Sequence, residues 1–124
     1  MNKTFTILLM IFFHIVDDYY LQGILASMKQ KLWWEKQEEY TDKYKYDYLV
    51  ALFMHSFSWA FMIMLPIAFV HNFQIGISFV IVFGLNVIIH AMVDNLKANN
   101  FKVNLVQDQA IHMAQIIITA IGLL

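Results

Sequence analysis

Four long hydrophobic stretches account for most of this 124-residue chain and restrict its folding more than any other feature. They run from about residue 4 to 26, 48 to 70, 73 to 94 and 103 to 124. A helix needs about 20 mostly apolar residues to cross the hydrocarbon core of a bilayer, and each stretch has that length. The sequence therefore predicts one integral membrane domain over residues 1–124, folded as an all-α, four-helix transmembrane bundle.

The composition supports this class of protein and excludes others. Hydrophobic residues make up 60% of the chain, against about 45–50% in soluble domains, and only 14% are charged. The net charge of −1 gives no basic footprint for nucleic acid, and the lack of cysteine excludes disulfides and thiolate ligands. Because Lys3 precedes an apolar run, a signal peptide is the alternative for the first stretch, but no small-residue cleavage motif follows it.

The segment between the first two stretches differs in character from the rest of the chain. Residues 28–48 read MKQKLWWEKQEEYTDKYKYDY and combine lysine and acidic residues with two tryptophans and four tyrosines. Trp and Tyr favour the membrane–water boundary, and Lys can reach from that boundary into water. We interpret the segment as a partly helical interfacial connector, with a solvated loop as the alternative.

Lysine distribution predicts the orientation. Four crossings place residues 28–47 and 96–104 on the same side, and these connectors hold every lysine except Lys3. Lysine-rich loops stay in the cytoplasm. We therefore expect a multi-pass protein of the cell inner (cytoplasmic) membrane with both termini outside. Glycines at 23, 76 and 84 would allow close helix packing, within one chain or in an oligomer.

Polar residues recur inside the hydrophobic stretches at one helical turn. Residues four apart share a helix face, and three His–Asp pairs have this spacing. Given the alternating helix directions, all of them fall at a similar depth, in the cytoplasmic half of the bilayer. Charged groups in a membrane are costly and face a bundle interior or an aqueous cavity. The pairs are His14 with Asp18, His90 with Asp94, and His112 with Asp108; the second stretch adds His55.

These side chains predict a divalent-metal site. Imidazole and carboxylate together suit Zn, Mn or Fe, and helical bundles hold di-metal sites between facing helices. The number of ligands exceeds what one tetrahedral zinc needs, which indicates two metals, or one metal and a general base. Lys97 is the only cation near this predicted site. A bound metal would therefore supply the remaining positive charge needed to balance the carboxylates. The predicted ligands are His14, Asp18, His55, His90, Asp94, Asp108 and His112.

A second set of polar residues would orient the ligands or contact a substrate: Asp17, Gln22, Asn86, Lys97 and Gln109. A metal-free proton or polar network is the main alternative, and scattered residues near helix ends are another. A lone intramembrane histidine is usually a packing residue, and we interpret His71, at a turn, in that way.

The order of these motifs resembles that of DUF3307, a family of small bacterial and phage membrane proteins, over nearly the whole chain. That family has no assigned activity, and it is more distantly similar to inner-membrane proteins described as metal-dependent hydrolases, the YdjM-like group. The adjacent Asp17 and Asp18 depart from the pattern. The resemblance is carried by His14-x-x-x-Asp18-x-x-Leu21-Gln22, His55, His90-x-x-x-Asp94-x-x-Lys97 and Asp108-Gln109-x-x-His112.

Two function classes follow from the sequence. One is a metal-dependent hydrolase of a lipid-borne ester or phosphoester, since a metal activates water and stabilises developing negative charge; Lys97 would then contact phosphate. The other is a non-enzymatic membrane protein: a metal or proton carrier, or an interaction partner with a structural polar core. The sequence assigns no catalytic residue. The lipid bilayer is the expected partner in both cases.

Overall fold

The computed structural model describes all residues 1–124 and is entirely helical, as the sequence predicts. Four long helices carry most of the chain, and shorter helical turns lie between the first two of them. In chain order the elements are α1 (Lys3–Val16), a π-helical turn η1 (Asp17–Leu21), α2 (Leu25–Met28), α3 (Lys31–Glu35), a 3-10 turn η2 (Asp42–Tyr44), α4 (Asp47–Val70), α5 (Ile77–Ala98) and α6 (Leu105–Leu123).

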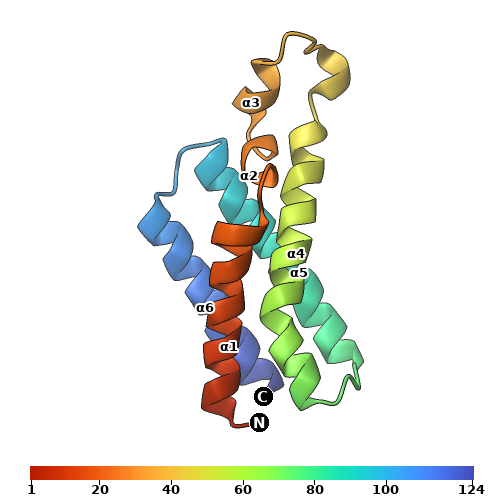
Figure 1. The fold of residues 1–124 in the computed structure, drawn as a ribbon, viewed down its shortest axis with the longest axis vertical. Coiled ribbons are helices and arrows are strands. Elements are labelled where there is room, and N and C mark those ends of the chain that lie inside the picture. The colour runs from red at the N-terminus through yellow and green to blue at the C-terminus, as the bar shows by residue number, and fades with distance from the viewer.

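The four long helices alternate in direction and pack against one another. Contacts join α1 to α4, α4 to α5, α5 to α6 and α6 back to α1. Both termini and the turn between α4 and α5 lie at one end, while α2, α3 and the loop between α5 and α6 lie at the other (Figure 1). We call the second end the connector end.

Three segments are long and apolar enough to cross a membrane: Lys3–Leu21, Asp42–Val70 and Ile77–Ala98. Helix α6 is not among them, because polar residues between Gln107 and Gln115 interrupt its apolar sequence. Three of the four predicted crossings are therefore supported by length and composition.

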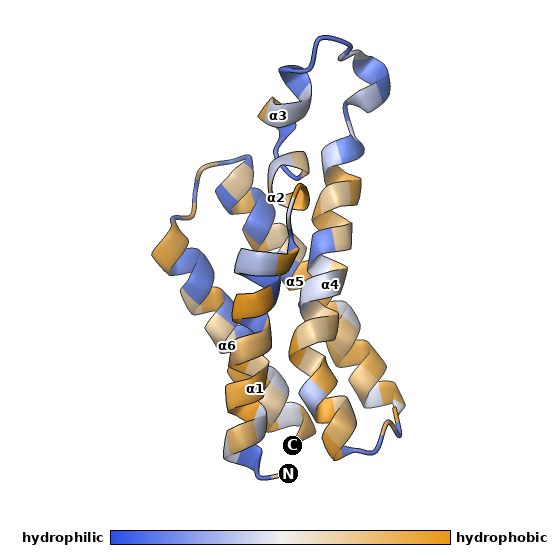
Figure 2. Cartoon of the chain, viewed as in Figure 1, coloured by the Kyte–Doolittle hydropathy of each residue, from blue (hydrophilic) through white to orange (hydrophobic).

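The distribution of polarity is the reverse of that in a water-soluble protein. Of 29 buried residues, 14 are polar or charged. In soluble proteins, charged residues are almost never fully buried unless they are paired. The helix exteriors are largely apolar towards the lower part of the molecule, and hydrophilic residues gather at the connector end (Figure 2). Large hydrophobic side chains that remain exposed include Leu8, Phe12, Phe61, Val80, Ile81, Leu85, Ile88, Ile118 and Ile121.

Three helix boundaries differ from the prediction by four or five residues, and one of them is the end of α5 at Ala98 rather than 94. The first helix was expected to reach residue 26, but it ends at Leu21, and Gly23 has a φ of 51°, a left-handed conformation that glycine adopts without steric cost. The third helix begins at Ile77 rather than 73, because Gly76 is its extended N-cap residue. The second and fourth helices lie close to their predicted limits.

The connector is partly helical, as expected, and it folds back towards the bundle. The Trp34 indole donates a hydrogen bond of 2.7 Å to the carbonyl oxygen of Met28, and the Lys31 ammonium lies 4.8 Å from the centroid of the Tyr48 ring. On the other side, the Asn99 side chain accepts from the Lys31 backbone N–H and donates to the Lys29 carbonyl. The connector is thereby tied to the end of α5.

Candidate metal centre

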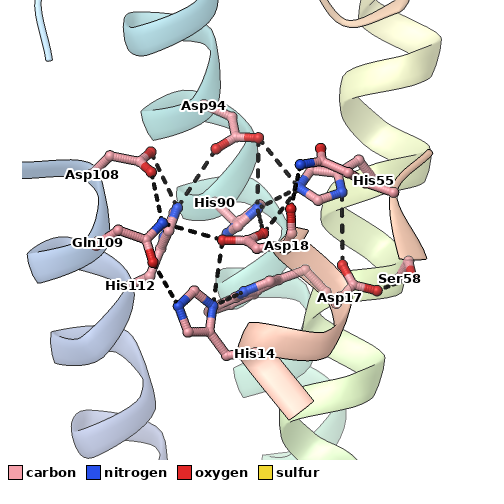
Figure 3. Close-up of polar contacts among 12 residues, drawn as sticks. His14, Asp17, Asp18, His55, Ser58, His90, Asp94, Asp108, Gln109 and His112 are labelled. Atoms are coloured by element: carbon pink, nitrogen blue, oxygen red, sulfur yellow. Dashed lines mark hydrogen bonds and ion pairs between the residues drawn. The ribbon is translucent and has the colours of Figure 1, made fainter. Parts of the chain in front are cut away.

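Four histidines and four aspartates converge between the long helices, nearer the connector end. Side chains from α1, η1, α4, α5 and α6 point toward one another there (Figure 3). Every one of these side chains is buried. We call this set the His/Asp cluster; it consists of His14, Asp17, Asp18, His55, His90, Asp94, Asp108 and His112.

A π-helical turn explains how both adjacent aspartates can be buried. In an α-helix, neighbouring side chains point about 100° apart, so one of two would usually face outward. Here the N–H of Gln22 bonds to the carbonyl of Asp17, five residues earlier, which widens the turn. Single π turns of this kind are frequent at functional sites. Asp17 and Asp18 therefore both reach the interior.

One group of donor atoms has the spacing of metal ligands. His55 Nε2 lies 3.1 Å from His90 Nε2, 3.4 Å from Asp18 Oδ1 and 3.3 Å from Asp94 Oδ2. His90 Nε2 lies 4.0 Å from the same Asp18 oxygen and 3.8 Å from the same Asp94 oxygen. Tetrahedral zinc with bonds of about 2.0–2.1 Å holds its ligands about 3.3 Å apart. Asp18, His55 and His90 are close enough to hold one ion with small adjustments, and Asp94 Oδ2 lies beside them.

A second group lies beside the first. His90, Asp94 and His112 offer ligand atoms within 4.8 Å of one another. His112 Nε2 is 3.6 Å from Asp94 Oδ1 and 3.3 Å from Asp108 Oδ1. Asp94 therefore directs Oδ2 at the first group and Oδ1 at the second.

Unpartnered buried atoms lie at the second group. His112 Nε2 and Asp108 Oδ1 face each other without a hydrogen bond. Burying polar atoms without partners is costly, and such atoms in a protein interior call for an explanation. A cation between the two would satisfy both lone pairs.

One imidazole is held from behind by a hydrogen bond, and a carboxylate lies behind another. Asp17 Oδ2 lies 3.7 Å from His55 Nδ1, beyond hydrogen-bond distance, and Ser58 donates a hydrogen bond to the other oxygen of Asp17. His112 Nδ1 pairs with Gln115 Oε1 at 3.1 Å. Carboxylates or carbonyl oxygens behind a histidine fix the ring so that the other nitrogen faces the metal.

His14 occupies a different position from the ligand role predicted for it. The Trp59 indole N–H donates to His14 Nδ1 at 2.7 Å, so Nδ1 is the acceptor. The other ring nitrogen, Nε2, therefore carries the proton and donates it to Gln109 Oε1 at 2.9 Å. The Gln109 amide in turn donates to Asp18 and Asp108. His14 therefore has no free lone pair, and it supports the carboxylates through Gln109 instead of belonging to either donor group.

Two lysines reach the His/Asp cluster, whereas the sequence predicts only Lys97 there. Lys97 Nζ lies 2.9 Å from Asp108 Oδ2. Lys29, from the connector, is buried and places its Nζ 2.7 Å from Asp94 Oδ2 and 3.0 Å from Gln22 Oε1. The expectation that the connector lysines stay away from the cluster is therefore wrong: part of the charge that a metal was expected to balance is balanced by Lys29.

The remaining predicted residues lie at different distances from the two donor groups. Gln22 contacts Lys29, as described. Asn86 lies deeper, where it donates to Thr119 at 2.8 Å and accepts from Gln115 at 3.1 Å, and it does not touch a donor group. His71 is exposed at the opposite end and pairs with the Leu123 carbonyl, so it is hydrogen-bonded as predicted but is not a buried packing residue.

Sequence reasoning missed Lys29 and Trp59. Trp59 is fully buried and stacks on His90 with ring centroids 4.2 Å apart. Its position four residues after His55 was a usable signal, because that spacing puts both on one helix face. Lys29 gave no such signal, since its carboxylate partner is 65 residues away in the chain.

Comparisons with protein-family models, with curated proteins and with solved structures found no match to this chain.

Proposed function

We propose that this chain is an integral membrane protein in which α1, α4, α5 and α6 form a four-helix transmembrane bundle around a divalent-metal centre. We further propose that the centre hydrolyses an ester or phosphoester carried by a lipid. The observation that carries the proposal is the convergence of donor atoms from four helices, with buried lone pairs left unpartnered, in an interior otherwise surrounded by apolar helix exteriors.

The inclusion of α6 as a fourth crossing rests on the distribution of its residues. Its polar side chains Asp108, His112 and Gln115 are buried against the other helices, whereas Ile118 and Ile121 are exposed. An apolar exterior over a polar interior is what a helix needs in lipid. The lysine-rich connector end would then face the cytoplasm, with the centre just below that surface and both termini outside.

The ligands in this proposal are divided between two adjacent ions. A bound Zn, Mn or Fe ion would polarise the ester or phosphoryl oxygen of a substrate and activate a water molecule. Gln115 holds the His112 imidazole by a hydrogen bond, and Asp17 lies behind His55. Gln109, paired with His14, donates to two of the carboxylates. The candidate ligands are Asp18, His55 and His90 for one ion, and Asp94, His112 and Asp108, with His90 beside them, for the other.

The second function class is a metal or proton carrier, or a protein with a purely structural polar core. The observation in its favour is a hydrogen-bonded series that leads from the cluster away from the connector end, from His112 through Gln115 and Asn86 to Thr119. Helix α6 has no polar side chain after Thr119 to continue the series, which favours the hydrolase. Membership in the DUF3307 family also stays a proposal, based on the order of motifs.

The topology can be tested with single cysteines in a chain that has none of its own. We expect Lys36→Cys and Lys102→Cys to react with an impermeant thiol reagent only from the cytoplasmic side, and Asn72→Cys only from the outside. The reason is that α4 and α5 would separate position 72 from both connectors by one membrane crossing. Reaction of Lys36→Cys and Asn72→Cys from the same side would contradict the four-crossing arrangement.

The activity can be tested with the full chain reconstituted in lipid vesicles with Zn, Mn or Fe. Mass spectrometry of the vesicle lipids should show a hydrolysis product that accumulates with the wild-type protein and is abolished by His90→Ala, because His90 belongs to both donor groups. His71→Ala, at the opposite end of the molecule, is the matched control and should retain full activity. Equal product formation by wild type and His90→Ala would refute the proposed centre.

A further inference from the structure

We propose that a pocket over the His/Asp cluster binds the phosphate group of a lipid phosphomonoester, with Lys29 and Lys97 as its cationic contacts. This inference rests on the proposed function and specifies its substrate class. It decides between the two bond types left open above in favour of the phosphoester.

The pocket connects the outside of the molecule to the candidate metal centre. It has a volume of about 110 Å³, which is room for a group of several non-hydrogen atoms such as phosphate. Two of the residues that line it, Asp18 and Asp94, belong to the donor groups, so a molecule in this pocket would lie next to the proposed ions. It is lined by Asp18, Tyr19, Gln22, Lys29, Asp94, Lys97, Leu105 and Gln109.

Both lysines present unused hydrogen-bond donors in this pocket. An ammonium group has three N–H donors. Lys29 uses two of them, on Asp94 and Gln22, and Lys97 uses one, on Asp108. One donor on Lys29 and two on Lys97 are therefore left over. Phosphate oxygens are strong acceptors for such charged donors.

The charges of the cluster select a phosphate only after metal has bound. The four carboxylates of the cluster exceed the two lysines by two negative charges, so the metal-free pocket repels anions. One divalent ion balances that excess, and a second leaves a surplus of two positive charges. A phosphomonoester carries about −1.5 to −2 at neutral pH and matches the surplus, whereas an uncharged ester does not.

The rim of the pocket indicates that the phosphate is attached to a lipid. Tyr19 and Leu105 line the opening, and both are more than half exposed. They belong to η1 and to the start of α6, beside the apolar exteriors of the bundle. A phosphate held by the two lysines could therefore direct an attached hydrocarbon chain past these two side chains into the bilayer.

Calorimetric titration of the metal-loaded, detergent-solubilised full chain tests this inference. The probes are short-chain phosphatidate, short-chain diacylglycerol and inorganic phosphate. We expect phosphatidate to bind most tightly, and Lys97→Gln to weaken that binding by about tenfold or more, as the loss of one charged contact does. Lys97→Arg should restore most of the affinity. Lys97 is preferred to the buried Lys29 because its side chain is one-third exposed and its replacement disturbs packing less.

The control is Lys102→Gln, in the loop that follows α5 and outside the pocket, which should bind phosphatidate like wild type. Chelation should also weaken phosphatidate binding. The inference would be overturned if wild type and Lys97→Gln bound phosphatidate equally tightly, or if the wild type bound diacylglycerol as tightly as phosphatidate. Tighter binding of inorganic phosphate than of phosphatidate would show that the phosphate is not carried by a lipid. Metal content and lipid hydrolysis measured on the same samples separate the two proposals. If metal binding and lipid hydrolysis are the same in wild type and Lys97→Gln, only the phosphate inference fails. If the wild type shows neither metal binding nor lipid hydrolysis, the proposed function fails as well.

Discussion

Replacement of His90 by alanine is expected to remove the bound metal and to lower the thermal stability of the protein. His90 belongs to both donor groups, and its Nε2 lies within 4.0 Å of Asp18, His55 and Asp94 donor atoms. A ligand that binds only the folded state stabilises it by about 4 kcal/mol when its free concentration is a thousand times its Kd. Elemental analysis of purified protein should therefore show metal in the wild type and little in His90→Ala. The unfolding temperature should fall in parallel.

Chelation separates the loss of metal from the loss of packing. His90 is fully buried against Trp59 and His112, so its truncation also leaves a cavity. Chelator should lower the unfolding temperature of the wild type and leave that of His90→Ala unchanged. His71→Ala is the control, and it should retain both the metal and the response to chelator. Absence of metal from gently purified wild type, with melting unaffected by chelator, would instead indicate a metal-free network in which Lys29 and Lys97 balance part of the carboxylate charge.

The second large effect is expected from Trp59→Ala. The Trp59 indole is fully buried, stacks on His90 and donates a hydrogen bond to His14. Truncation of a buried tryptophan costs about 3–5 kcal/mol, so the free energy of unfolding should fall by that amount. Trp59→Phe keeps most of the ring and should lose about 1–3 kcal/mol, the cost of leaving His14 Nδ1 without its donor. Equilibrium unfolding in mixed micelles measures both.

Trp33→Ala is the matched control for this substitution. Trp33 is only partly buried in α3, where its ring packs against Trp34 at a centroid distance of 5.0 Å, away from the His/Asp cluster. Its truncation should cost clearly less than that of Trp59 and leave the metal content unchanged. A Trp59→Ala protein as stable as Trp33→Ala would mean that the indole does not hold the cluster together.

Local periodicity in the sequence predicted the long helices and the faces on which their polar residues lie. The apolar stretches predicted all four long helices, and the four-residue spacing of His14 with Asp18, and of His90 with Asp94, predicted which polar residues share a helix face. Alternating helix directions then predicted that these residues meet at one level. The structure has all of them in one buried cluster near the connector end. Helix ends at Leu21 and Ile77 were less predictable, because they depend on the backbone conformations of Gly23 and Gly76.

The partner that each side-chain atom faces depends on how the helices pack together. The wider turn at η1 lets Asp17 point inward behind His55, and the hydrogen bonds from Trp59 and to Gln109 use both nitrogens of His14. Lys29 reaches Asp94 because the connector folds back onto the end of α5. Each of these contacts joins residues that no sequence period relates. Periodicity fixes the face on which a side chain lies, but the pairing of donors with acceptors depends on how the helices are turned and packed against one another.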